Sequence, residues 1–212
     1  AISVESGMAI IGSFAGSYAL GSANQGIIPA SMPDLLVIFA GKITESSGIY
    51  ELSDNITIDD SNRDYFPIPI ENGFIFDGNN KTINIGVDTW TGLFTAISTA
   101  SEITFYLKNT TINVTSGRFT SGNSWFFKDN NSDKYELNNI NINNCHTTTE
   151  TSVTINYYGG GIVGRYFGYN ATCSIYGCSN SLKINGNYAG GIAGQYIGTS
   201  NGSIRFLLSL VE

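Results

Sequence analysis

Five aspartates in the first half of the chain are the side chains best suited to chemistry. They are Asp54, Asp59, Asp60, Asp64 and Asp77. Grouped carboxylates bind Ca²⁺ through their oxygens, and a pair of carboxyl groups can cleave a glycosidic bond as acid and base. Such cleavage also needs a long groove and usually a basic residue, and only Lys42, Arg63 and Lys81 are near in sequence. We therefore expect a solvated loop without catalytic residues; a calcium site and cleavage of a polysaccharide are the alternatives.

Thiol and imidazole chemistry is the next candidate. His146, the single histidine, directly follows Cys145, but adjacent residues of a strand face opposite sides and do not converge on a metal. Cys145 and Cys178 occupy matching places in two copies of an Ile-x-x-Cys element, whereas Cys173 lacks the spacing of a zinc knuckle. We expect a buried ladder of free thiols and no cofactor; a disulfide or a zinc ion between Cys145 and Cys178 are the alternatives.

Four tyrosines near glycine-rich segments are candidates for recognition. They are Tyr158, Tyr166, Tyr188 and Tyr196. If they point outward at matching places, their rings form a stripe on which sugars or proteins can stack. If they point inward, they fill the interior beside the glycines. Both alternatives depend on the elements that carry these rings.

Those elements repeat along the chain. Residues 160–168 (GGIVGRYFG) recur thirty positions later as residues 190–198 (GGIAGQYIG), a spacing typical of stacked supersecondary units. A weaker copy of the block lies at residues 91–97 (TGLFTAI). Glycine in such blocks provides either a backbone with positive φ or a close approach between two backbones.

Between the blocks, apolar and polar residues alternate with period two. The segments are residues 56–58, 82–85, 111–114 and 137–142. Each is a short strand with one apolar face, and none can bury that face alone. Stacked about 4.8 Å apart, the strands would merge their apolar faces into one interior column.

The glycine blocks and the strands before them resemble the GLUG repeat of bacterial surface and adhesin-like proteins. The resemblance rests on Gly160-Gly161-Ile162-Val163-Gly164 with the preceding Tyr158, on its second copy after Tyr188, and on residues 74–83 (FIFDGNNKTI). Residues 50–58 and 91–94 supply the flanking elements in the family's order, so the resemblance covers residues 49 to about 205. It implies a right-handed parallel β-helix at a cell surface.

The two ends of the chain differ from this pattern. Ser31, Pro33 and Asp34 form a helix start ahead of an apolar run that stops at Gly41, so we expect a short helix over about 31–40 within a capping region of residues 1–48. A buried strand is the rival interpretation. Residues 203–212 are strongly apolar, which indicates an edge shielded by twist, by a partner chain or by further sequence.

Composition excludes some classes of protein. Only 13% of the 212 residues are charged and the net charge is −7, with no run of Lys or Arg, so nucleic acid is not an expected partner. No apolar stretch approaches the roughly 20 residues that cross a bilayer, so we expect no membrane insertion.

We therefore predict an all-β chain: a capping region (residues 1–48) followed by a β-solenoid (residues 49–212). The predicted function is that of a structural or interaction module in an extracellular, cell-surface or virion assembly. Its partners would be proteins or further copies of itself, bound through the solenoid ends or a lateral face, with glycans as a further class of partner. The alternative is a carbohydrate-binding or carbohydrate-active module.

Overall fold

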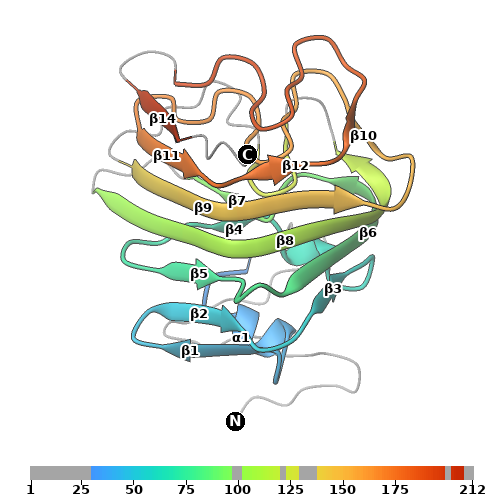
Figure 1. The fold of residues 1–212 in the computed structure, drawn as a ribbon. Helices are drawn as coiled ribbons and strands as arrows, with labels where there is room; N and C mark the ends of the chain where they lie inside the picture. The colour runs from blue at the N-terminus through green and yellow to red at the C-terminus, as the bar shows by residue number, and fades with distance from the viewer. Residues whose placement is uncertain (1–29, 97–101, 120–122, 129–137, 199–201, 208–212) are drawn as a thin grey trace, which may run out of the picture.

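The chain folds as a β-solenoid of about four turns built from stacked parallel strands, as seen in a computed structural model (Figure 1). The structure describes residues 30–96, 102–119, 123–128, 138–198 and 202–207. The all-β solenoid predicted from the alternating strands and the repeated blocks is confirmed.

The elements follow one another in short steps. The helical ones are α1 (Leu35–Ile38) and the 3₁₀ turn η1 (Arg63–Tyr65). The strands of the first coils are β1 (Ile43–Ser46), β2 (Ile49–Leu52), β3 (Ile56–Ile58), β4 (Ile68–Pro69), β5 (Ile75–Asp77), β6 (Thr82–Trp90) and β7 (Phe94–Thr95). Those of the later coils are β8 (Ile103–Phe119), β9 (Asn138–Thr149), β10 (Thr154–Ile155), β11 (Thr172–Tyr176), β12 (Ser179–Asn180), β13 (Lys183–Ile184) and β14 (Ser203–Leu207).

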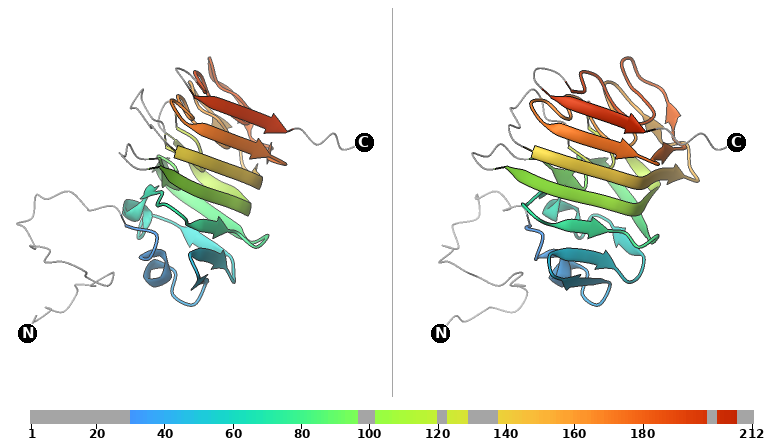
Figure 2. Two further views of the ribbon diagram at one scale, coloured as in Figure 1. Left: turned by 90° about the vertical axis from the view of Figure 1, so that its left-hand side faces the viewer. Right: turned by 60° about the vertical axis from the view of Figure 1, so that its left-hand side comes forward.

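One ten-stranded sheet forms the long face of the solenoid. Its main path is β1-β2-β5-β8-β9-β11-β14, and β3, β6 and β12 pair beside it. All of its pairings are parallel except the first, in which β1 runs antiparallel to β2. Figure 2 shows the strands stacked in chain order from the N-terminal to the C-terminal end. The fold thus has two different ends along one axis.

Strand register brings like residues together on neighbouring coils. Ile56 pairs with Ile83, and Ile83 pairs with Ile112; all three are buried. The same arrangement joins Phe76 to Leu107, and Leu107 to Ile142. Since successive side chains of a strand alternate between faces, the polar residues between these positions point to solvent. The interior is therefore a column of stacked apolar side chains, as the period-two pattern predicts.

A second wall closes the coil opposite the large sheet. It consists of the pair β4 and β7 and of single parallel bridges, Phe94 to Phe127, Ser124 to Gly160 and Gly160 to Gly190. Phenylalanine rings line its inner side: Phe94 and Phe127 lie 6.0 Å apart, and Phe127 and Phe167 lie 4.9 Å apart, between ring centroids. Aromatic contacts of this kind add stability beyond simple burial.

Glycine in the repeated blocks serves close packing. A Cβ on Gly161 would lie 2.2 Å from the carbonyl oxygen of Gly191, and one on Gly194 would lie 2.1 Å from that of Tyr158. Neither glycine has a positive φ. Both roles predicted for glycine in these blocks are realised, because Gly161 and Gly194 allow the coils to approach closely while Gly168 and Gly198 hold positive φ, 75° and 61°.

The N-terminal end is covered by a short helical turn. Ser31 donates its backbone N–H and its hydroxyl to Asp34 Oδ2, at 2.8 and 2.7 Å, which is the backward half of a capping box. The α-helix itself covers only Leu35–Ile38, four residues rather than the predicted ten, because Phe39 leaves the helical region (φ −118°, ψ 49°). Leu35 and Phe39 pack into the core below it.

Candidate functional site

Two stacked pairs of tyrosines form the most distinctive side-chain arrangement of the solenoid. The rings of Tyr158 and Tyr188 lie 5.5 Å apart with planes 5° from parallel, and those of Tyr166 and Tyr196 lie 5.1 Å apart at 19°. The guanidinium carbon of Arg165 lies 5.3 Å from the ring centroids of both Tyr158 and Tyr166. Cation–π attraction at that distance links the two pairs into one cluster, here called the tyrosine ladder.

Backbone geometry at these tyrosines is unusual. Tyr158, Tyr166, Tyr188 and Tyr196 have φ between 56° and 60°, the left-handed region that favours glycine or asparagine. For other residues that region costs roughly 1–2 kcal/mol per position. We infer that ring stacking along the axis offsets this cost.

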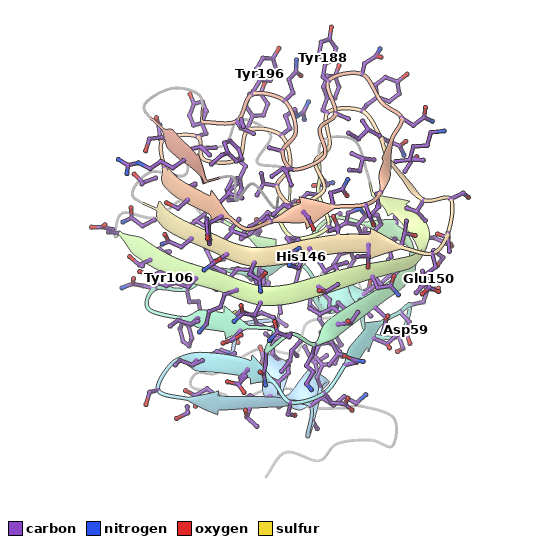
Figure 3. The ribbon with its side chains drawn as sticks, viewed as in Figure 1. Asp59, Tyr106, His146, Glu150, Tyr188 and Tyr196 are labelled. Carbon is purple, nitrogen blue, oxygen red and sulfur yellow. The ribbon has the colours of Figure 1, made fainter. Side chains whose placement is uncertain are left out.

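Half of the tyrosine ladder faces solvent at the end of the solenoid. Tyr188 is 64% exposed and Tyr196 is 50% exposed, while Tyr158 and Tyr166 lie half-buried beneath them. Figure 3 shows Tyr188 and Tyr196 projecting beyond the last coil. The structure thus brings together all four candidate tyrosines, and it presents two of them at one end.

A polar ladder runs along the opposite, large sheet. Asp77 Oδ1 accepts from Asn109 Nδ2, and Asn109 Oδ1 accepts from Asn144 Nδ2, each at 3.1 Å. His146 continues the chain, with Nε2 2.9 Å from Asn144 Oδ1 and Nδ1 2.7 Å from Ser179 Oγ. These residues come from β5, the corner of β8, β9 and β12, and sequence reasoning did not pick out this connection. The 33-residue offset between His146 and Ser179 is the signal that could have found it.

The tautomer of His146 follows from its partners. The amide nitrogen of Asn144 is used toward Asn109, so its oxygen accepts a proton from His146 Nε2, which leaves Nδ1 to accept the Ser179 hydroxyl proton. Burial lowers the pKa of His146, so the ring is neutral at pH 7. A neutral imidazole beside a hydroxyl is the arrangement of a base and a nucleophile.

Acyl transfer needs more than this pair, because two donors must also hold the developing oxyanion. The nearby N–H groups of Ser181 and Leu182 are already used, by Thr147 O at 2.9 Å and by Asn180 Oδ1 at 3.2 Å. Neither of these two N–H groups is therefore free to hold an oxyanion beside Ser179.

Asp77 is the anchor of the polar ladder. It also accepts from Lys108 Nζ and from the N–H of Asn79, both at 2.9 Å. Partial burial by itself raises the pKa of Asp77, but the hydrogen bonds and the charge of Lys108 outweigh burial and hold that pKa below its usual range. Asp77, one of the candidate calcium ligands, therefore already accepts hydrogen bonds from protein donors.

The other four aspartates are spread over the first coil. Asp60 and Asp64 lie 3.1 and 3.7 Å from the guanidinium of Arg63, Asp59 accepts from Ser61, and Asp54 accepts from the N–H of Asn55. Over the described ranges, no three Asp, Glu, His or Cys side chains lie close enough together to hold a metal ion.

A shallow polar groove lies across neighbouring strands of the large sheet, beside the C-terminal end of β9. Its volume is about 350 Å³. The lining residues are Asn55, Thr82, Asn84, Asn113, Thr148, Thr149 and Glu150. Asn113 donates to Asn84 Oδ1 at 3.1 Å, so amides of neighbouring coils are already linked across the floor. Figure 3 shows Glu150 beside the C-terminal end of β9.

All three cysteines are free, and Cys145 and Cys178 lie side by side as the repeated Ile-x-x-Cys element predicts, although Cys178 is half-buried rather than buried. Register places Cys178 beside Cys145 on the next coil, and Cys173 beside Ile140. Burial raises the pKa of Cys145 well above its usual value and that of Cys173 to about 12. His146 points outward from the same strand, so it does not meet Cys145.

No family model matches the chain, and no curated protein or solved structure gives a match. Within the described residues, no helix is long and apolar enough to cross a membrane.

Proposed function

We propose that the chain is a structural and interaction module: a stiff β-solenoid of an extracellular, cell-surface or virion assembly, such as a spike, fibre, coat or adhesin. The observation that carries the proposal is the tyrosine ladder, whose exposed rings Tyr188 and Tyr196 lie at the solenoid end. Exposed tyrosines on a rigid frame are typical of protein interfaces, since each ring gives much contact area for little loss of conformational freedom.

Stiffness of the frame supports this function. The apolar column, the polar ladder from Asp77 to Ser179 and the tyrosine ladder all run along the axis, so each coil is tied to the next through its core and its surface. The resemblance of residues 49 to about 205 to GLUG repeats agrees with a surface protein of the adhesin-like kind.

Location is the decisive test. Lys128 is exposed and would react with an amine reagent that does not cross membranes. We expect intact source cells or particles to yield the chain labelled at Lys128 before lysis. Labelling that appears only after lysis would contradict a surface role.

Binding of a carbohydrate is the second candidate, favoured by the polar groove at Asn84, Asn113 and Glu150. Amide and carboxylate groups in a row can hydrogen-bond sugar hydroxyls. On a glycan array, this candidate predicts binding that is lost in Asn113→Ala with Glu150→Ala and kept in Tyr188→Ala. Absence of binding to any glycan would remove it.

We also propose that the module is not an enzyme. Ser179 should therefore not react with a fluorophosphonate, a reagent that labels activated serines, although His146 lies beside it. Labelling of Ser179 that is lost in His146→Ala would overturn this statement.

A further inference from the structure

The last coil carries three backbone N–H groups that correspond to hydrogen-bonded N–H groups on the preceding coil. Gly161, Ile162 and Val163 donate their N–H groups to the carbonyl oxygens of Gly191 and Ile192, at 2.9–3.1 Å. In the part of the chain that the structure describes, the matching N–H groups of residues 191–193 donate to no protein atom. Among the described residues, the second wall thus ends in N–H groups equivalent to those that bind the next coil at residues 161–163.

Among the described strands, the large sheet is bounded by β1 at one edge and by β14 at the other. Within these same strands, β1 pairs only with β2, and β14 pairs only with β11. Because β1 alone runs antiparallel, β14 of one copy would meet β1 of a copy stacked above it as an antiparallel neighbour. Antiparallel pairing is a stable way to continue a sheet.

Charge differs between the two ends. Residues 151–211 contain Arg165, Lys183 and Arg205 and no aspartate or glutamate. The first coil carries seven acidic residues against two basic ones, Lys42 and Arg63. The acidic residues are Asp34, Glu45, Glu51, Asp54, Asp59, Asp60 and Asp64. Opposite charges attract when the C-terminal end of one copy meets the N-terminal end of another, and like charges oppose contact between two identical ends.

Exposed apolar side chains accompany these charges. The last coil exposes Ile184, Tyr188, Tyr196 and Phe206, by 42–64%, and the N-terminal end exposes Val37 of α1 by 47%. Covering such side chains at a contact contributes stability roughly in proportion to the area removed from water.

From these observations we propose that the C-terminal end binds the N-terminal end of a second copy of this chain, so that copies stack head to tail. The contact joins β14 to β1 of the second copy and places Lys183 and Arg205 against its acidic first coil. A head-to-tail contact of this kind is heterologous and builds a filament. The proposal rests on the proposed structural function and names its partner.

Charge exchange tests the proposal on the full chain. The tail variant carries Lys183→Glu and Arg205→Glu, and the head variant carries Glu45→Lys and Asp54→Lys. The side variant carries Lys81→Glu and Lys128→Glu and is the lateral control. The exposed residues among these are Lys183, Arg205, Glu45, Asp54 and Lys128. Sedimentation velocity would measure the weight-average mass over a concentration series at low and high salt, with circular dichroism to confirm folding.

We expect the mass of the wild type and of the side variant to rise to at least twice the 22.8 kDa of one chain and to fall as salt is added. The tail and head variants should each stay at 22.8 kDa alone, and an equimolar mixture of the two should recover the rise, because each acidic end then meets a basic one.

Three outcomes would overturn head-to-tail stacking: a wild type that stays monomeric, a tail variant that still associates, or a mixture that does not recover. None of them alters the surface-labelling result, so failure of this inference and failure of the proposed function are distinguishable.

Discussion

The rings of Tyr158 and Tyr188 stack face to face, 5.5 Å apart and 5° from parallel, although both residues hold the backbone at φ 60°. The pair therefore combines a favourable side-chain contact with an unfavourable backbone conformation, and substitutions at Tyr188 can separate the two.

Three substitutions of Tyr188 should lower the free energy of unfolding by different amounts. Tyr188→Phe keeps the stack and should change the free energy of unfolding by less than about 0.5 kcal/mol. Tyr188→Ala loses the stack and keeps the strained backbone, and should cost about 1 kcal/mol. Tyr188→Gly also loses the ring but tolerates positive φ, so it should be less destabilised than Tyr188→Ala. Urea unfolding would measure the order; equal stability of the Ala and Gly variants would argue against backbone strain.

Matching glycines of the repeat should respond very differently to alanine. Gly161→Ala would place a Cβ 2.2 Å from Gly191 O, so the coils must separate, at a cost of about 2–3 kcal/mol. At Gly191 the nearest atom to an added Cβ is 3.8 Å away, an ordinary contact. Gly191→Ala should thus change stability by less than about 0.5 kcal/mol. Thermal unfolding of both variants checks this; similar losses would mean that close approach is not what selects glycine.

Stability should depend on pH through Asp77. The folded state lowers the pKa of Asp77 below its unfolded value of about 3.9. Its contribution is therefore fully present above the unfolded pKa and is lost as pH falls through the folded pKa. Asp77→Asn should cost about 1–2 kcal/mol at pH 7, because Lys108 loses its ion pair. Urea unfolding of this variant should also show a weaker loss of stability between pH 5 and pH 2 than the wild type.

The control for Asp77 is Asp64→Asn, since Asp64 is an exposed partner of Arg63. Asp64→Asn should retain the wild-type pH dependence. A parallel decline of all three proteins would assign the acid sensitivity to other groups.

The thiols should be hidden in the native protein. Burial raises the pKa of Cys173 to about 12 and also raises that of Cys145, so neither forms a thiolate at pH 8. A chromogenic disulfide reagent should titrate at most the half-buried Cys178 in the native state and all three thiols in denaturant. Cys178→Ser should abolish the native reaction; a rapid native reaction in that variant would contradict the buried positions of Cys145 and Cys173.

Much of the stacking could be predicted from sequence, because register in a solenoid follows directly from spacing. The thirty-residue offset between residues 160 and 190 became a parallel bridge, and the alternating isoleucines near residues 56, 83 and 112 became one buried column. Matching Ile-x-x-Cys elements likewise placed Cys178 beside Cys145. These features depend on local periodicity, which a single sequence displays.

Other features could not be predicted, because they depend on how corners turn. Nothing in the sequence indicated that β1 would reverse direction against β2, or that tyrosines as well as glycines would hold positive φ in and beside the repeated blocks. The aspartates look clustered in sequence, yet Arg63 pairs with both Asp60 and Asp64, and Asp77 is paired with Lys108. Sequence spacing alone does not show which donors already occupy these carboxylates.

The bridge between Gly160 and Gly190 has a consequence for how such a molecule can change its length. The two glycine blocks meet through backbone hydrogen bonds from Gly161, Ile162 and Val163 to Gly191 and Ile192, so duplicating the thirty-residue unit between them would add one coil, or roughly 4.8 Å. Neither end of the molecule would need to change. A single gene duplication event could therefore set the reach of the rod in discrete steps, independently of whatever its ends bind.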